Sequence, residues 1–268
     1  TNKFKNQIRK IEKRDLDINL SAVCYGCTWS DNFSLKNLKN LSESTSMSKI
    51  SLFYSFIKDL VGLANINNHK VKSLIDNSKY SEITMTWGNQ DDFDKFGNFK
   101  DRYFNKKNNI SKKKLKFIFI TGKFNKIKLL NGNILFLNDN KKIKIWSLLK
   151  ILYEIFLKYN CSVYKFYNYA NFYSLFAILV FKNIKKIIIK YKIKVLHIPY
   201  EGQPFQKYLI QGLKITYPKI KIFGYAHASQ PLPLHMLNKN NKMDNLIVSS
   251  HDHYHQMKNR LGWPKKKL

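Results

Sequence analysis

The pattern of hydrophobic positions changes along the chain from a purely helical one to one that mixes strands and helices. Between residues 50 and 63, apolar side chains recur with a period near 3.6, which is typical of a helix with one buried face. After a Lys-rich spacer at 106–114, short apolar runs alternate with longer periodic segments. We expect strands at 83–87, 117–121, 134–137, 195–199, 220–225 and 245–249, and helices at 143–159, 172–191, 204–217 and 251–261.

This alternation predicts the fold class. Strands separated by helices of ten or more residues usually pair in parallel, and helices then cover both faces of the sheet. We therefore predict an α/β fold with a Rossmann-like, mainly parallel sheet over residues 111–264. Residues 1–110 are predicted to form a mixed helical and irregular lead-in with one strand and an aromatic, acidic loop. The spacer marks the predicted boundary.

The composition narrows the classes of function. The chain has 268 residues, of which 44% are hydrophobic and 15% aromatic, and this excludes a disordered protein. Its formal net charge of +31 would point to nucleic acid or an anionic membrane as partner. Only four of the 48 basic residues are arginines, although phosphate-binding sites favour the arginine fork. We read the lysines as a general bias of the sequence and expect no specific nucleic acid partner.

The cysteines and the apolar segments indicate in which cellular compartment the protein is expected. Cys24, Cys27 and Cys161 are too few for a disulfide framework, which favours a reducing cytoplasm. The longest strongly apolar stretch, at 172–181, is about half of the ~18–20 residues that a spanning helix needs. Cys24 and Cys27 form a lone C-x-x-C without the second pair of ligands that structural zinc requires.

The histidines and glycines argue against a metal or a nucleotide cofactor. His251 and His255 would share a helix face from which His253 points away, so they predict a polar helix start. The ten glycines are never closer than nine residues apart, which excludes a G-x-G-x-x-G fingerprint, and no P-loop is present. We predict no metal and no cofactor.

Proton-transfer side chains follow two predicted strands. Glu201 and Gly202 lie between the strand at 195–199 and a helix that starts at Pro204, and His227 follows the next strand. In a parallel sheet these ends lie at the edge where ligands bind, so Glu201 and His227 are the catalytic candidates. Each has a structural alternative: Glu201 as a helix-capping carboxylate, and His227 as a hydrogen-bonded surface residue.

A segment rich in aromatic, amide and carboxylate side chains follows the strand at 83–87. Flat rings and planar polar groups suit the faces and hydroxyls of sugars, although such a segment can also be a folded surface loop anchored by its rings. The candidate substrate-binding residues are Trp87, Asn89, Asp92, Asp101, Arg102 and Tyr103 from this segment, with Gln203 and Ser229 from the loops after the later strands.

Three segments carry a resemblance to a known family. The run from Ile198 to Pro231, with Y-E-G-Q-P-F and G-Y-A-H-A-S-Q-P, resembles bacterial surface-carbohydrate (O-antigen or capsule) biosynthesis proteins of the GT-B glycosyltransferase type. The earlier W-G-N-Q-D-D-F-D-K-F-G-N-F-K-D-R-Y-F looks like a segment of the same proteins. The closing N-L-I-V-S-S and L-G-W-P look like the end of a first GT-B domain. The resemblance spans about residues 80–264.

The resemblance implies an activity. Proteins of this type transfer a sugar, with inversion, from a nucleotide-activated donor to a hydroxyl of a growing lipid-linked glycan, generally without a metal. Glu201 would then be the base, and His227 an alternative base or a partner on the phosphate side. A second GT-B domain is not found in these residues, so the chain would be the acceptor-side domain. We expect a cytoplasmic protein, peripheral on the inner face of the membrane, whose lysines contact anionic lipid.

Two alternatives remain from other classes of function. One is a non-catalytic, basic nucleic-acid-binding protein, whose affinity would fall steeply with salt. The other is a catalytically silent scaffold of a polysaccharide-assembly complex, which would keep its function when both Glu201 and His227 are replaced.

Overall fold

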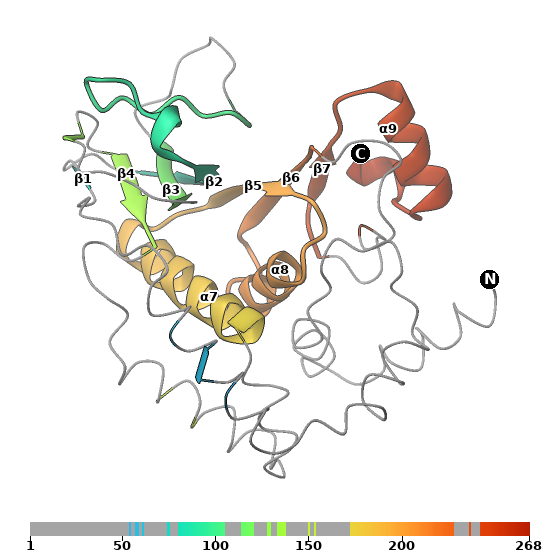
Figure 1. Cartoon of the computed structure of the whole chain (residues 1–268). Helices are drawn as coiled ribbons and strands as arrows, with labels where there is room; N and C mark the ends of the chain where they lie inside the picture. Colours follow the sequence, from blue (N-terminus) through green and yellow to red (C-terminus); the bar gives the residue numbers. More distant parts are fainter. Residues whose placement is uncertain are drawn as a thin grey trace.

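The fold is built on a central β-sheet (Figure 1). The computed structural model describes residues 80–104, 114–120, 133–137, 172–227 and 242–268, together with residues 54, 57, 58, 61, 74, 75, 128, 129, 150, 153 and 236. The strands are β1 (Leu74–Ile75), β2 (Glu82–Gly88), β3 (Lys114–Ile120), β4 (Asn133–Phe136), β5 (Val195–Tyr200), β6 (Lys221–Ala226) and β7 (Asn245–Ile247).

The strand order identifies the sheet as Rossmann-like. Across the sheet the strands follow as β1-β4-β3-β2-β5-β6-β7, with β1 antiparallel to β4 and the other six strands parallel. The parallel strands lie in the order β4-β3-β2-β5-β6-β7. If they are numbered from one along the chain, this is the order 3-2-1-4-5-6 of a doubly wound sheet. The direction of strand addition reverses between β2 and β5, so a crevice is expected at their carboxyl ends. The predicted α/β, Rossmann-like sheet is confirmed.

The described helices follow the periodic segments of the sequence. They are α7 (Phe172–Tyr191), α8 (Pro204–Thr216) and α9 (His251–His255), with a π-helical turn at Gln256–Arg260 and short 3-10 turns at Gln90–Asp92 and Lys265–Lys267. The predicted helix at 251–261 is therefore split into an α-helical and a π-helical part. Among the described residues, no helix is both long and apolar enough to cross a lipid bilayer.

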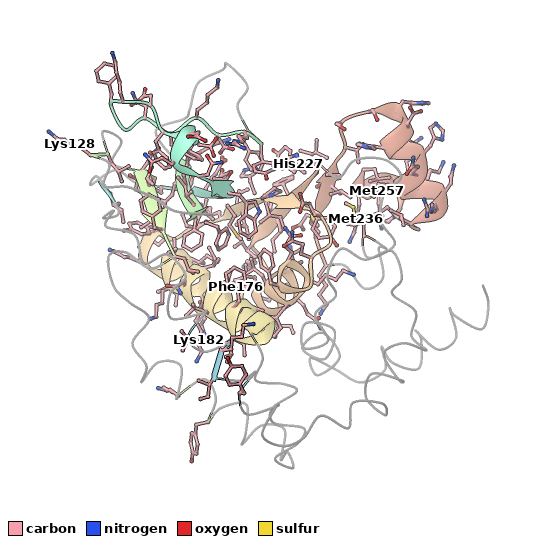
Figure 2. The ribbon with its side chains drawn as sticks, in the orientation of Figure 1. Lys128, Phe176, Lys182, His227, Met236 and Met257 are labelled. Atoms are coloured by element: carbon pink, nitrogen blue, oxygen red, sulfur yellow. The ribbon has the colours of Figure 1, made fainter. Side chains whose placement is uncertain are left out.

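One face of the sheet is covered by α7 and α8, which pack against each other (Figure 1). Alternate strand residues point to this face because successive side chains in a strand face opposite sides. Phe117 and Phe119 of β3 are buried here, and Phe176 of α7 packs against Phe119 at 5.9 Å between ring centroids. Figure 2 shows Phe176 among the side chains that fill the space between α7 and the sheet.

The other face of the sheet carries an irregular segment over β3 and β4 in the described part of the chain. We expected helices on both faces, but among the described residues the second face over β3 and β4 is covered by residues 89–104, which contain one 3-10 turn. Phe93 and Phe99 of this segment pack on each other at 5.0 Å and bury Ile118, Ile134 and Phe136. Aromatic rings supply the apolar area that a helix usually provides, so a short irregular segment is enough to cover the apolar side chains of β3 and β4 on this face.

Several predictions concern the N-terminal part of the chain. The lead-in before residue 54, the extended segment at 162–166 and the Cys24–Cys27 pair lie outside the described residues. Ile57 and Val61, predicted on a buried helix face, are helical but 41% and 54% exposed. Strand β2 precedes the predicted boundary at 110 and yet lies in the middle of the sheet, so one sheet includes residues from both sides of that boundary.

Candidate functional site

A pocket of about 330 Å³ lies at the carboxyl ends of β2 and β5, where the strand order reverses. A pocket at this switch point is the usual ligand site of a doubly wound sheet, and its volume is at the small end of the range for ligand sites. Its lining residues come from the end of β2 and from the segments after β2 and β5: Trp87, Gly88, Asn89, Asp92, Arg102, Tyr103, Glu201 and Gln203.

The end of β2 is closely packed, which fixes one wall of the pocket. A Cβ atom on Gly88 would lie 2.9 Å from Phe99 Cε2 and 3.0 Å from Ile118 Cγ2, so only glycine lets the 89–104 segment approach β3 this closely. Trp87 packs on Phe119 and Phe205, at 4.7 and 6.0 Å between ring centroids. The indole is thereby held between the sheet and the start of α8.

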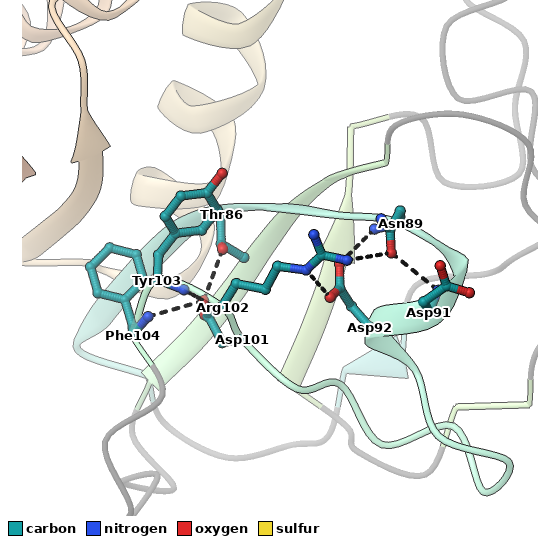
Figure 3. Close-up of polar contacts among 8 residues, drawn as sticks. All are labelled: Thr86, Asn89, Asp91, Asp92, Asp101, Arg102, Tyr103 and Phe104. Carbon is teal, nitrogen blue, oxygen red and sulfur yellow. Dashed lines mark hydrogen bonds and ion pairs between the residues drawn. The ribbon is translucent and has the colours of Figure 1, made fainter. Parts of the chain in front are cut away.

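A reciprocal polar cap shapes the segment after Gly88. The Asn89 side chain accepts a hydrogen bond from the Asp91 amide at 3.1 Å, and the Asp92 carboxylate accepts one from the Asn89 amide at 2.9 Å. Arg102 joins both ends of this turn: its Nε donates to Asp92, and one terminal nitrogen donates to Asn89 Oδ1 at 3.0 Å (Figure 3). Asp92 is buried, whereas the Arg102 side chain is 54% exposed.

Asp101 anchors the end of the same segment beneath the pocket wall. Its Oδ1 accepts hydrogen bonds from Thr86 Oγ1 at 3.0 Å and from the amides of Tyr103 and Phe104 at 3.0 and 3.2 Å (Figure 3). Asp101 is 3% exposed, and Lys116 Nζ lies 3.8 Å from Oδ2. Burial lowers the pKa of Lys116, and the nearby Asp101 opposes that shift. Asp101 therefore supports the pocket without lining it.

Glu201 occupies the loop between β5 and α8. Gln203 Nε2 donates to Glu201 Oε2 at 2.8 Å, and the other carboxylate oxygen has no hydrogen-bond partner among the described residues. Burial raises the pKa of Glu201, although the Gln203 hydrogen bond opposes this. Gly202 has φ +72°, a left-handed conformation that lets the chain turn into α8. The loop is locked by Gln206, whose Oε1 accepts from the amides of Glu201 and Gln203.

Tyr103 separates His227 from the pocket. The ring centroids of Tyr103 and His227 are 4.7 Å apart. Phe104 packs edge-on against Tyr225 of β6, with 4.6 Å between the ring centroids. Figure 2 labels His227 on the side of the sheet that faces the 89–104 segment. The Nε2 atom of His227 is buried and has no partner among the described residues, and burial lowers the pKa of the ring, against the attraction of Asp101. Burial and the charge of Glu201 raise the pKa of Tyr103.

The structure brings most of the sequence candidates together. Seven of them line the pocket: Trp87, Asn89, Asp92, Arg102, Tyr103, Glu201 and Gln203. Asp101 lies beneath the wall and His227 lies behind Tyr103, while Ser229 is outside the described residues. Sequence reasoning did not single out Gly88 or Gln206. The spacing of Gln206 three residues after Gln203, at a helix start, was an available signal for its capping role.

A second polar cluster, not anticipated from the sequence, surrounds His197 of β5. His197 Nε2 is 3.1 Å from Glu82 Oε2, Lys114 Nζ is 3.3 Å from the same oxygen, and the Tyr225 hydroxyl is 3.4 Å from His197 Nδ1. Burial lowers the pKa of His197, with the Glu82 hydrogen bond acting in the opposite direction. The sequence contained one indication of this cluster: the polar His197 lies between the core residues Leu196 and Ile198. Because side chains alternate along a strand, His197 is on the opposite face of the sheet from those two residues.

The three histidines of α9 do not gather at one point. The Nε2 atoms of His251 and His255 are 3.2 Å apart on the exposed face, whereas His253 is buried and its Nδ1 lies 2.7 Å from Ser249 Oγ. This is the division of faces that the helical spacing predicted. Within the described part of the chain, no three His, Cys, Asp or Glu side chains are grouped so that they could hold a metal ion.

Comparison with known proteins adds no relative: no family model, no curated protein and no solved structure matches this chain.

Proposed function

We propose that the chain is the acceptor-binding domain of a GT-B glycosyltransferase, which transfers a sugar from a nucleotide-activated donor to a hydroxyl of a surface polysaccharide or lipid-linked glycan. The observation that carries the proposal is the position of Glu201, a pocket carboxylate with a raised pKa and one unpartnered oxygen among the described residues. A carboxylate of raised pKa is a better acceptor for a hydroxyl proton than an ordinary one.

The other lining groups suit a saccharide. Trp87 and Tyr103 offer apolar ring surface, and the amides of Asn89 and Gln203 offer donors and acceptors for hydroxyl groups. Asn89 and Gln203 are each held by hydrogen bonds to neighbouring carboxylates or guanidinium, so their orientation is set before a ligand arrives. Preorganisation of this kind lowers the entropy cost of binding.

In the proposed step, Glu201 takes the proton of the acceptor hydroxyl. The acceptor oxygen forms a bond to the anomeric carbon of the donor, and the bond from that carbon to the phosphate oxygen breaks, with its electron pair leaving on the nucleotide. His227 packs against Tyr103 rather than lining the pocket, so we assign it the role of supporting that wall. We place the protein in the cytoplasm, peripheral on the inner face of the membrane.

A paired binding and transfer assay tests this proposal. The chain is mixed with UDP-, GDP- or CMP-activated sugars and with saccharide acceptors; nucleotide release reports transfer, and saturation-transfer NMR reports saccharide binding. Because Gln has the shape of Glu but is not a base, Glu201→Gln should keep saccharide binding and lower transfer by about 100-fold or more. Asp252→Asn, an exposed carboxylate on α9, is the matched control.

Two results contradict the proposal. If the wild-type chain binds no saccharide, the pocket is not an acceptor site. If it binds saccharides and the Glu201→Gln variant transfers sugar at the wild-type rate, Glu201 is not the base and the catalytically silent scaffold is the better description.

A further inference from the structure

Arg102 is held in the pocket wall with part of its guanidinium group unused. Its Nε atom and one terminal nitrogen donate to Asp92 and Asn89, and the other terminal nitrogen has no acceptor among the described residues. The two hydrogen bonds fix the plane of the group, and the side chain is 54% exposed. A fixed guanidinium with outward N–H groups is the geometry that binds carboxylate or phosphate through two parallel hydrogen bonds.

An arginine at position 102 is unusual for this chain, because most of its basic residues are lysines. The chain has 48 basic residues, of which four are arginines, and Arg102 and Arg260 are the two in the described part. A lysine at position 102 could place one ammonium group near Asp92, but it could not also reach Asn89 and still present a fork to a ligand. At position 102 the shape of the guanidinium is used, because the group bonds Asp92 and Asn89 together.

The lining of the pocket therefore includes one cationic group beside a carboxylate of different chemistry. Arg102 is the one cationic side chain among the described lining residues, and Glu201 stands on the loop after the neighbouring strand. The backbone amides of Glu201 and Gln203, which could otherwise bind an anion at the start of α8, are already bonded to Gln206. An anionic group on a ligand would thus be recognised by the Arg102 side chain, with a hydroxyl group directed to Glu201.

We propose that the saccharide bound here is acidic, carrying a carboxylate or a phosphate that the free N–H groups of Arg102 bind. This inference rests on the proposed saccharide-binding function and specifies its substrate class. Glucose, glucuronate and glucose 6-phosphate provide the test, since they differ only at carbon 6, and the galactose series provides a second stereochemistry. NMR titration of the full chain with each compound gives the dissociation constants.

The expected result is preferential binding of the acidic sugars. A charge-assisted hydrogen bond of this kind changes affinity by about tenfold or more, so the wild type should bind glucuronate or glucose 6-phosphate about tenfold more tightly than glucose. Arg102→Lys should remove most of that preference, and the exposed Arg260→Lys should leave it unchanged. Preference for the uronate identifies a carboxylate as the natural group, and preference for the phosphate ester identifies a phosphate.

The ratio of acidic to neutral affinity separates this idea from its alternatives. If Arg102→Lys merely distorts the pocket, the affinity for glucose falls in parallel and the ratio is unchanged, which overturns the inference. An unchanged ratio also results if the acidic sugars bind to surface lysines of this +31 chain. Equal wild-type affinities for neutral and acidic sugars overturn the inference while the proposed function stands. If no sugar binds, both fail together.

Discussion

Thr86→Val tests whether a single buried hydrogen bond holds the pocket wall. Thr86 is fully buried in β2, and its hydroxyl donates to Asp101 Oδ1 at 3.0 Å. The same oxygen accepts the amides of Tyr103 and Phe104, so the bond links the sheet to the end of the 89–104 segment. Valine keeps the shape of threonine but cannot donate, and the buried carboxylate loses the one side-chain hydrogen bond shown for it.

The expected loss of stability in Thr86→Val follows from the charge of the acceptor, the Asp101 carboxylate. A hydrogen bond to a charged group contributes about 1.5–3 kcal/mol, so Thr86→Val should lower the free energy of unfolding by that amount. Thr84→Val is the matched control, because Thr84 is also buried, lies two residues away on the same face of β2, and its hydroxyl has no hydrogen-bond partner among the described residues. Replacing it should change stability by less than about 1 kcal/mol.

Urea denaturation of the two variants measures this difference directly. The midpoint should shift for Thr86→Val while the slope with urea stays constant, which shows that the same surface is exposed on unfolding. The chemical shifts of Tyr103 should also move in Thr86→Val and stay in place in Thr84→Val, because only the first change releases Asp101. If the two variants agree within about 0.5 kcal/mol, Asp101 does not anchor the wall through Thr86 and the reasoning is wrong.

Three further predictions concern packing, pH and membranes. Gly88→Ala should lower stability by about 1–3 kcal/mol and weaken ligand binding, measured by urea denaturation and NMR titration, because its Cβ would collide with Phe99 and Ile118. Burial lowers the pKa of His197 and His227 below the usual 6.5, so the native state holds fewer protons than the unfolded chain. These two histidines should therefore lower the stability as pH drops from 7 to 5, and either His→Gln change should make the decline with falling pH smaller than in the wild type; an unchanged or steeper decline would contradict this. Sedimentation with phosphatidylserine vesicles should show binding that salt abolishes, whereas salt-resistant binding or none would exclude electrostatic docking.

The elements whose signal is local could be predicted closely from the sequence. The helix expected at 172–191 has those bounds in the structure, because its apolar periodicity continues without interruption. The last strand ends two residues earlier than predicted, at Ile247, because the Ser250 side chain accepts the His253 amide and starts α9 there. Local hydrogen bonding of this kind overrides the apolar run.

The parts that depend on distant contacts could not be predicted. The π-helical turn at 256–260 follows α9 where the Trp263 indole donates to the carbonyl of Met236, a partner far away in the sequence. The course of residues 89–104 also depends on packing between Phe99 and Ile118. The positions of the candidate residues at strand ends could be predicted, and the strand order brings most of them to one pocket. Which side chains line that pocket could not be predicted: Tyr103 does, and His227 packs behind it.

The pocket differs from the nucleotide site that usually accompanies this strand order, and the difference supports side-chain recognition. In dinucleotide-binding folds the first strand leads through a glycine-rich turn into a helix whose free amides bind phosphate. Here β2 leads into a single 3-10 turn, where the Asn89 amide is bonded to the Asp92 side chain and the Asp91 amide to the Asn89 side chain. Before α8, the amides of Glu201 and Gln203 are bonded to Gln206. These four amides are not available to a ligand, which favours recognition by side chains. Those available are rings, amides, one guanidinium and Glu201, a set better matched to hydroxyl groups and a single anionic substituent than to a pyrophosphate.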